Sequence, residues 1–308
     1  MEIAVPREKS RPMVTRGTAL VAIAAVSFGS VAILGKLAYS LNIPLATLLA
    51  ARFGIAALLL WIIVAALRPK LVPRAKLPVA FGLGLMLFVQ TVAYFTTLHM
   101  IPAALTSLLL FTFPAIVTTV DHFLGYRLTM LRGGTVAIAL LGTFLVVAAP
   151  VETLSPAGIA CGLLTAAFYS VYILVASRAL RGMPPLATTA TMVTTSAVAF
   201  AVYALVAGDR PPPLTASSGL VMLGIAVLST VIPITLQSIG MPEIGSSRAA
   251  VIGTLELVTT VILAASVLHE HVSAIQTLGG GLIVASIVLR EGVEVAALPK
   301  AALRRSEG

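Results

Sequence analysis

Residues 247–271, SRAAVIGTLELVTTVILAASVLHEH, form an apolar run that carries one carboxylate, Glu256, near its middle. A helix crosses the hydrocarbon core of a bilayer in about 20 apolar residues, and few other structures satisfy all of their backbone groups there. The run is therefore long enough for one crossing. A carboxylate that faced lipid would be costly, so Glu256 must be paired, protonated or turned toward an internal cavity. We predict a transmembrane helix beside a polar interior.

The apolar character extends over the whole chain of 308 residues, of which 10% are charged, and the mean hydropathy is +1.07. A soluble core cannot hide this much apolar surface. We therefore predict an all-α integral membrane protein with ten transmembrane helices. They are expected at residues 15–39, 44–67, 77–98, 102–122, 129–149, 155–177, 185–207, 215–240, 245–268 and 273–290.

The formal net charge of +9 could suggest nucleic-acid binding, but the positions of the cations argue against it. On the ten-helix map, 16 of the 20 Lys and Arg residues fall on one side. By the positive-inside rule both termini are cytoplasmic. We expect a multi-pass protein of the inner (plasma) membrane, with the lipid bilayer as a partner and no nucleic acid. The cations on that side are Arg7, Lys9, Arg11, Arg16, Arg68, Lys70, Arg74, Lys76, Arg127, Arg132, Arg178, Arg181, Arg290, Lys300, Arg304 and Arg305.

The two halves of the chain resemble each other weakly. Residues 117–120 and residues 258–261 both read VTTV, which alone is a poor signal in an apolar alphabet. A five-helix unit that is repeated once must insert with the opposite orientation. The loop cations agree, because Arg127 and Arg132 follow the fourth predicted helix whereas residues 269–271, after the ninth, contain no Lys or Arg. We therefore predict two inverted repeats of five helices. The predicted parts are a cytoplasmic arm at 1–14, the repeats at 15–149 and 155–290, and a cytoplasmic tail at 291–308.

Polar side chains form stripes inside several predicted helices. In the third, Gln90, Tyr94 and Thr97 are spaced by four and three residues, which places them on one helix face. The sixth has the same spacing. Ordinary bonding to the backbone or to neighbouring helices is the alternative, but Tyr, Gln and Thr on one face of separate helices favour a polar cavity with aromatic walls. The stripe residues are Gln90, Tyr94 and Thr97, then Thr165, Tyr169 and Tyr172, then Thr230 and Gln237, and the substrate-binding candidates are Gln90, Tyr94, Tyr169, Tyr172, Gln237 and Ser27.

Two prolines, Pro114 and Pro233, lie well inside the fourth and eighth predicted helices. Each removes one backbone hydrogen bond and frees a carbonyl one turn earlier, near Leu110 and Ser229. Transporters often use such breaks near the middle of the membrane to build sites. We predict helix-break or gating roles for both prolines, and a packing kink whose carbonyl is satisfied by a neighbour is the alternative.

Arg52, Arg248 and Glu256 are the candidate buried charges. At 1.5 Å per residue, Arg52 lies roughly 12 Å and Glu256 roughly 18 Å below the outer ends of their helices, so the two can pair if those helices touch. A saturated structural pair, or a carboxylate bonded to hydroxyls, is one interpretation. The other is a carboxylate that binds a substrate ammonium group or carries a proton. Arg248, near the cytoplasmic start of its helix, can snorkel or bind a carbonyl.

Motifs of other function classes are missing from the sequence. It contains no HExxH, no paired-aspartate motif and no Cys/His cluster, and Cys161 is its single cysteine. A Walker A motif is also absent, so energy must come from gradients or exchange. We expect no enzyme activity, no metal and no cofactor, with a polytopic intramembrane enzyme as a remote alternative.

Residues 236–289, LQSIGMPEIGSSRAAVIGTLELVTTVILAASVLHEHVSAIQTLGGGLIVASIVL, resemble the last helices of EamA-type carriers of the drug/metabolite transporter superfamily. In that pattern an arginine opens helix nine and matches Arg248, a glutamate usually followed by proline matches Glu256, and an acidic residue before helix ten matches Glu270. In the first half, Arg52 and Pro114 match its second-helix arginine and fourth-helix proline. The chain departs from the pattern at Leu257, where proline is common, and at Tyr126, where glutamate is frequent.

Within the superfamily the chain is most similar to bacterial amino-acid exporters of the YddG type. The resemblance implies a secondary transporter that exports amino acids and related small metabolites across the inner membrane. Transport would proceed by alternating access through a central cavity lined by helices one, three, four, six, eight and nine. A multidrug or aromatic-cation exporter is the alternative, since tyrosine faces and one carboxylate can hold a flat cation. The sequence leaves the oligomeric state open, a monomer included.

Overall fold

The computed structural model describes residues 11–123, 130–148, 155–180, 182–208, 215–244, 249 and 252–289. Within these residues every regular element is a helix, as predicted. The helices are α1 (Arg11–Phe28), α2 (Ser30–Ser40), α3 (Leu45–Leu67), the 3₁₀ turn η1 (Arg74–Lys76), α4 (Leu77–Met100), α5 (Ala103–Leu110), α6 (Phe113–Phe123), α7 (Met130–Ala148), α8 (Pro156–Ala179), α9 (Pro185–Ala207), α10 (Ala216–Ala226), the π turn η2 (Val227–Val231), α11 (Ile232–Ile244) and α13 (Leu255–Val267), followed by a helix at Ala274–Leu289.

Six helical stretches of the described chain are long and apolar enough to cross a membrane. They are Thr15–Ser40, Leu45–Leu67, Arg74–Met100, Pro156–Ala176, Pro185–Ala207 and Ala216–Met241. Shorter apolar helices, Ala103–Val117, Gly133–Val146, Leu255–Val267 and Ala274–Leu289, lie where the fourth, fifth, ninth and tenth crossings are predicted. Helices thus occur at each predicted position, and membrane crossing by the shorter ones stays a prediction. The first helix begins at Arg11, four residues inside the predicted N-terminal arm.

Prolines mark several helix starts, as their positions in the sequence indicate. Pro44 and Pro102 are the N-cap residues of α3 and α5, and Pro156 and Pro185 are the first residues of α8 and α9. Proline costs nothing there, because the first N–H groups of a helix have no partner within it.

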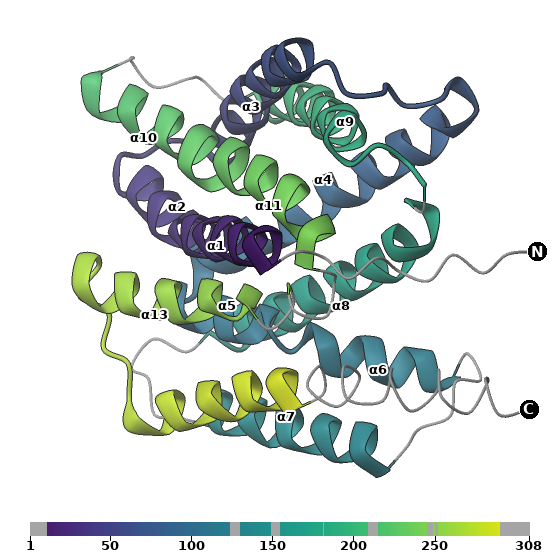
Figure 1. Ribbon diagram of the computed structural model, residues 1–308. Coiled ribbons are helices and arrows are strands. Elements are labelled where there is room, and N and C mark those ends of the chain that lie inside the picture. Colours follow the sequence, from purple (N-terminus) through teal and green to yellow (C-terminus); the bar gives the residue numbers. More distant parts are fainter. Residues whose placement is uncertain are drawn as a thin grey trace, which may run out of the picture.

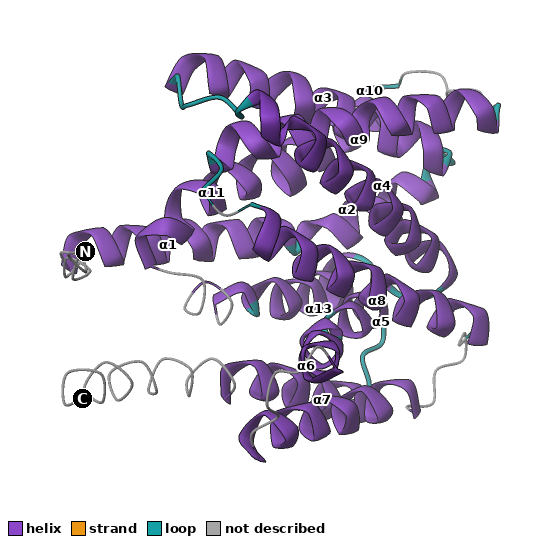
Figure 2. Ribbon diagram, turned by 90° about the vertical axis from the view of Figure 1, so that its right-hand side faces the viewer, coloured by secondary structure: helices purple, strands orange, loops and turns teal. Residues whose placement is uncertain are grey.

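The helices stack in layers (Figure 1). The pair α3 and α9 lies at the top of that view, α1 and α2 pack with α10 and α11 below it, and α13 lies beside α5. Figure 2 shows the same layers from the side. At the bottom, α7 packs on the helix Ala274–Leu289 so closely that a Cβ added to Gly142 would lie 2.6 Å from the Gly279 carbonyl oxygen. Only glycine permits this approach.

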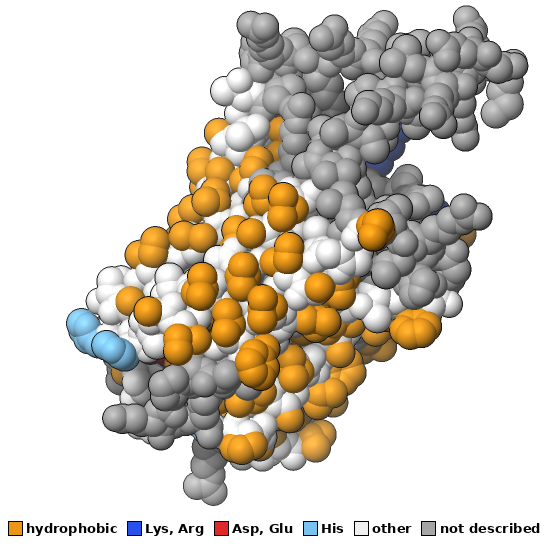
Figure 3. Space-filling view, turned by 90° about the horizontal axis from the view of Figure 1, so that it is seen from below, with side chains coloured by type: hydrophobic (Ala, Val, Ile, Leu, Met, Phe, Trp, Pro, Cys, Tyr) orange, Lys and Arg blue, Asp and Glu red, His pale blue; other side chains and the backbone are white. Residues whose placement is uncertain are grey.

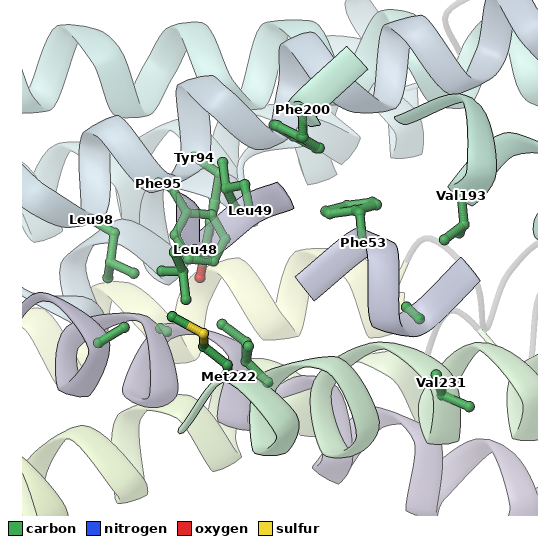
Figure 4. Packing of buried hydrophobic residues seen from close by; sticks show 14 of the residues in the cluster. Leu48, Leu49, Phe53, Tyr94, Phe95, Leu98, Val193, Phe200, Met222 and Val231 are labelled. Atoms are coloured by element: carbon green, nitrogen blue, oxygen red, sulfur yellow. The ribbon is translucent and has the colours of Figure 1, made fainter. Parts of the chain in front are cut away.

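The largest buried cluster joins α3, α4 and α9 and also includes residues of α2, α5 and α10 (Figure 4). The Phe53 and Phe200 rings lie 4.8 Å apart and Phe88 lies 4.7 Å from Phe200. Tyr94 and Phe95 extend this cluster from α4 toward the centre of the bundle. The aromatic core therefore fixes α4 and its polar stripe.

The outer surface is apolar, with hydrophobic side chains spread across the described part of the face in Figure 3. Leu205 and Val206 are each 81% exposed and Leu220 is 69% exposed. In water such a surface would aggregate, whereas in a bilayer it contacts acyl chains.

The connection after α13 joins two distant parts of the chain. His269 adopts a left-handed conformation with φ 55°, and the Glu270 N–H donates back to the Ala264 carbonyl at 3.1 Å. This turn directs the Glu270 carboxylate onto α5, where its oxygens accept from the N–H groups of Ala103 at 2.7 Å and Ala104 at 3.0 Å. Glu270 thus caps a helix that lies about half the chain away in sequence.

Candidate functional site

The polar stripes of α4 and α8 meet where these helices pack together in opposite directions. Gly158, in the first turn of α8, lies against the last turn of α4. Further along, the Thr97 and Thr165 hydroxyls lie 3.2 Å apart. Tyr94 precedes Thr97 by one turn on α4, and Tyr169 follows Thr165 by one turn on α8. Because the two helices run in opposite directions, both tyrosines lie on the same side of the threonine contact. The structure therefore brings together the two stripes that the sequence spacing predicts.

Aromatic rings form one wall of this region. Tyr169 and Tyr172 stack with ring centroids 6.0 Å apart and planes at 19°. Phe113, at the start of α6, meets the Tyr169 ring edge-on at 4.8 Å. The Tyr94 hydroxyl lies 3.4 Å from the Ser107 hydroxyl of α5, so α4, α5, α6 and α8 all contribute.

Glu256 lies at the start of α13, next to this wall. Residues 252–253 are helical, Thr254 forms a turn and α13 begins one residue later, so Glu256 occupies a first helical turn, where the helix dipole favours a carboxylate. Its half-buried side chain makes no hydrogen bond or ion pair with any other residue that the structure describes. It lies within electrostatic range of the hydroxyls of Tyr94 and Tyr169. A carboxylate that bonds no other described residue is thus held near the two stripes.

Arg52 binds neutral groups and does not pair with Glu256. It is 8% exposed, its Nε donates to the Thr230 hydroxyl at 2.9 Å and its Nη2 donates to the Ser229 carbonyl at 3.3 Å. Its guanidinium carbon also lies 5.3 Å and 5.4 Å from the ring centroids of Phe53 and Phe95. Two of the five N–H donors of Arg52 are therefore bonded to the protein.

Both internal prolines lie at irregular points of their helices. Pro114 is the second residue of α6, and residues 111–112 separate α6 from α5. Pro233 is the second residue of α11 and directly follows the π turn η2, and the helix continues through this turn without a gap. Helix-break and gating roles for both prolines stay predictions.

The other candidates take different positions. Gln90 is 8% exposed and lies one turn before Tyr94 on α4, and Gln237 is half-buried on α11. Neither amide bonds another described residue. The Ser27 hydroxyl is already used, because it donates to the Leu228 carbonyl at 2.5 Å. Arg248 lies outside the described residues.

Two participants were not among the sequence candidates: Ser107 and Phe113. Ser229 carries the carbonyl that the sequence analysis expects Pro233 to leave free, and here it accepts from Arg52. Phe113 adjoins the other internal proline. Ser107 lies in an apolar run, LTSLLLF at residues 105–111, that gives no indication of its neighbour Tyr94.

The chemistry of this region suits recognition of a positively charged group. A carboxylate near aromatic rings attracts an ammonium group through its charge, and the ring faces attract it as well. Among the described residues no group of three or more His, Cys, Asp or Glu side chains could hold a metal ion.

The comparison with known families gives a match over nearly the whole chain. The profile described as "EamA-like transporter family" matches residues 15–148 and again residues 156–290. The chain belongs to the EamA-like transporter family. It is therefore a multi-pass membrane protein of a transporter family, which agrees with the apolar helices of the structure.

Curated relatives of this EamA-family chain are named only as transporters. An "Uncharacterized transporter" of Synechocystis sp. is 27% identical over 223 residues, which cover 68% of this chain and 65% of that protein. The match thus spans just under two thirds of that relative. An "Uncharacterized transporter" of Archaeoglobus fulgidus is 22% identical over 208 residues, covering 68% of this chain and 74% of that protein.

A solved crystal structure shares the fold of this EamA-family chain. It superposes with a TM-score of 0.63 at 22% identity and covers 90% of this chain and 96% of the other. At this identity the likeness shows the fold alone.

Proposed function

We propose that this EamA-family chain is a secondary transporter that exports amino acids and related small metabolites across the inner membrane by alternating access. The observation that carries the proposal is the Glu256 carboxylate, which has no partner among the described residues and lies beside Tyr94 and Tyr169. Such a carboxylate is costly inside a membrane protein unless a ligand uses it. An amino acid supplies an ammonium group for it.

The remaining polar groups suit the rest of an amino acid. The amides of Gln90 and Gln237, which bond no other described residue, and the hydroxyls of Tyr169 and Tyr172 are hydrogen-bond donors for a substrate carboxylate. The stacked tyrosines offer a flat surface for a substrate side chain. In this proposal Ser27 has a packing role, because its proton is bonded to the Leu228 carbonyl.

We further propose that the ten helices form two inverted repeats with both termini in the cytoplasm. The two successive matches to the family profile support the repeat. The helix interruptions support it as well. The VTTV motifs are offset by 141 residues, so the interruption at residues 111–112 corresponds to residues 252–253, directly before the turn at Thr254. The one-sided cations support the orientation.

A second candidate is an exporter of flat aromatic cations. It is favoured by the Tyr169–Tyr172 stack, which the Phe113 ring meets edge-on, and by Glu256, which bonds no other described residue. A flat cation would lie on the ring faces and would need no donors for a carboxylate. Membership in a transporter family makes an intramembrane enzyme the weakest candidate.

Counterflow in proteoliposomes tests the leading proposal. Vesicles loaded with one unlabelled amino acid are exposed to a labelled one, with ethidium as a competing flat cation. We expect accumulation of label that requires the loaded amino acid. Glu256→Gln should weaken substrate binding about 30-fold or more, since removing one partner of a buried charge pair costs about 2 kcal/mol or more.

Tyrosine variants locate the site. Tyr94→Phe and Tyr169→Phe remove one hydroxyl each and should lower affinity, while Tyr203→Phe, a matched change on α9 where the ring packs on Phe88, should not. Folded protein that exchanges ethidium but no amino acid would favour the second candidate. Amino-acid counterflow that is unchanged in Glu256→Gln would refute the assigned site.

A further inference from the structure

The π turn η2 leaves backbone groups that other helices satisfy. In an α-helix the N–H of residue 233 would donate to the carbonyl of residue 229, but Pro233 has no N–H. Arg52 supplies that donor from α3, through Nη2 to the Ser229 carbonyl at 3.3 Å, and its Nε holds the Thr230 hydroxyl at 2.9 Å. The Thr230 hydroxyl in turn lies 3.1 Å from the Ile225 carbonyl, as donor to it. Arg52 therefore fixes the shape of η2.

The turn η2 also bonds the α1–α2 joint, by which we mean the connection at Gly29 between the end of α1 and the start of α2. The Ser27 hydroxyl donates to the Leu228 carbonyl at 2.5 Å, and the Ser30 and Ser229 hydroxyls lie 2.7 Å apart. These two serines flank Gly29, the residue between α1 and α2. A shift of η2 would therefore move this joint.

The joint contacts the turn of α13 that carries Glu256. The Thr260 hydroxyl donates to the Gly29 carbonyl at 3.1 Å and also lies 2.9 Å from the Glu256 carbonyl. The backbones approach so closely that a Cβ added to Gly29 would lie 2.7 Å from the Thr259 Cβ and 3.0 Å from the Glu256 carbonyl oxygen. Any movement of Gly29 is thus transmitted to Glu256.

We propose that Arg52 is a positioning residue for Glu256, acting through η2, the α1–α2 joint and Thr260. The proposal rests on the proposed function, in which Glu256 binds the substrate ammonium group. In this proposal Arg52 acts through its bonds to Ser229 and Thr230 and not through contact with the substrate. Its effect on transport is the placement of a carboxylate on another helix.

The test compares two ligands that differ in one group. L-Phenylalanine carries an ammonium group and 3-phenylpropionate lacks it, so the ratio of their affinities reports on the carboxylate that recognises the amine. In Arg52→Lys, and in Thr260→Val, which keeps the side-chain shape, phenylalanine should bind about tenfold more weakly, as when one bidentate or polar contact is lost. Binding of 3-phenylpropionate should not change. A general folding defect would instead weaken both ligands and leave the ratio unaltered.

Combined variants separate this inference from the proposed function. In the Glu256→Gln background, Arg52→Lys should cause no further loss for phenylalanine, because the group it positions is gone. Pro233→Ala restores an N–H that can bond the Ser229 carbonyl, so it should recover part of the Arg52→Lys loss. The matched control is Ser266→Ala, which removes an exposed hydroxyl bonded to its own helix on α13.

Each result decides one point. The positioning role would be overturned if Arg52→Lys weakened the binding of both ligands equally. It would also be overturned if the affinity losses of Arg52→Lys and Glu256→Gln added in the double variant. In both cases Glu256 would remain the binding group. An unchanged ratio in Glu256→Gln itself would overturn the proposed function, and the inference with it. The series of contacts from Arg52 to Glu256 is supported if the affinity ratio of the two ligands changes in both Thr260→Val and Arg52→Lys but not in Ser266→Ala.

Discussion

Removal of the Glu270 carboxylate should open the start of α5. The N–H groups of Ala103 and Ala104 belong to the first turn of a helix and have no acceptor within it. Glu270 accepts from both, at 2.7 Å and 3.0 Å. In Glu270→Ala these two amides lose their partner, and the negative charge at a helix N-terminus is lost as well.

The size of the effect depends on the two hydrogen bonds. A hydrogen bond to a charged group contributes about 1.5–3 kcal/mol, and Glu270 is half-buried, so we take a total of about 2–3 kcal/mol for the pair. At a factor of ten for every 1.4 kcal/mol, the amides of Ala103 and Ala104 should exchange with deuterium roughly 30 to 150 times faster. Glu270→Gln keeps one acceptor oxygen but no charge and should give about half of this free energy.

Hydrogen–deuterium exchange read by mass spectrometry, on protein in nanodiscs and with peptides that cover α5, measures this directly. The control is His271→Ala, which changes an exposed side chain of the same connection. Exchange at the start of α5 that stays as slow in Glu270→Ala as in the unchanged protein would show that the cap does not hold α5. Equal acceleration across all helices would point to global unfolding and would also contradict the local mechanism.

Three further predictions concern stability, measured as thermal unfolding in detergent. Gly29→Ala should destabilise by about 1–3 kcal/mol, because its Cβ would overlap a facing threonine, while Gly54→Ala, where no atom lies within 4 Å, should be neutral or stabilising. His269→Gly should stabilise by roughly 0.5–1 kcal/mol by relieving a left-handed residue, and an unchanged or lower midpoint would contradict this. Thr97→Val and Thr165→Val should show a coupling of about 0.6 kcal/mol in a double-mutant cycle, and strict additivity would mean that their 3.2 Å contact contributes nothing.

The positions of the helices could be predicted because the residue types in the sequence mark both their apolar interiors and their starts. Long apolar runs specify crossings, and prolines such as Pro44, Pro102, Pro156 and Pro185 mark starts at which they remove no hydrogen bond. The facing stripes of α4 and α8 could be predicted for a similar reason. Spacings of three and four residues place side chains on one face of any regular helix.

The partner of Arg52 could not be predicted. The similar depths of Arg52 and Glu256 along their helices suggested Glu256 as the partner, because opposite charges inside a membrane attract strongly. The structure instead gives Arg52 the carbonyl that Pro233 leaves free and the Thr230 hydroxyl. Depth does not give rotation about the helix axis or the identity of the neighbouring helix, and both decide a side-chain contact.

The orientation of Gln237 is a second limit. Gln237 and Thr230 are predicted to share one face only if the helix keeps a regular period of 3.6 residues per turn between them. The π turn η2 lies at residues 227–231, and an extra residue in a turn rotates the rest of the helix by about 100° around the axis. No residue type in VLSTV indicates such a turn, so the phase of α11 had to come from the structure.

Some central side chains bond no other described residue, and this has a consequence for hydration. Tyr169, Tyr172, Gln237 and Glu256 are half-buried and Gln90 is 8% exposed, and a polar group that gives up water without gaining a bond costs about 1–3 kcal/mol. Water therefore hydrates these groups when no solute is bound, and a solute enters by exchanging its own donors and acceptors for those of the departing molecules. The affinity for a solute then depends on how many of the hydrogen bonds of the displaced water it replaces, since displacing well-ordered water without replacing its bonds loses affinity. The transporter would discriminate among solutes by the water that each one can replace.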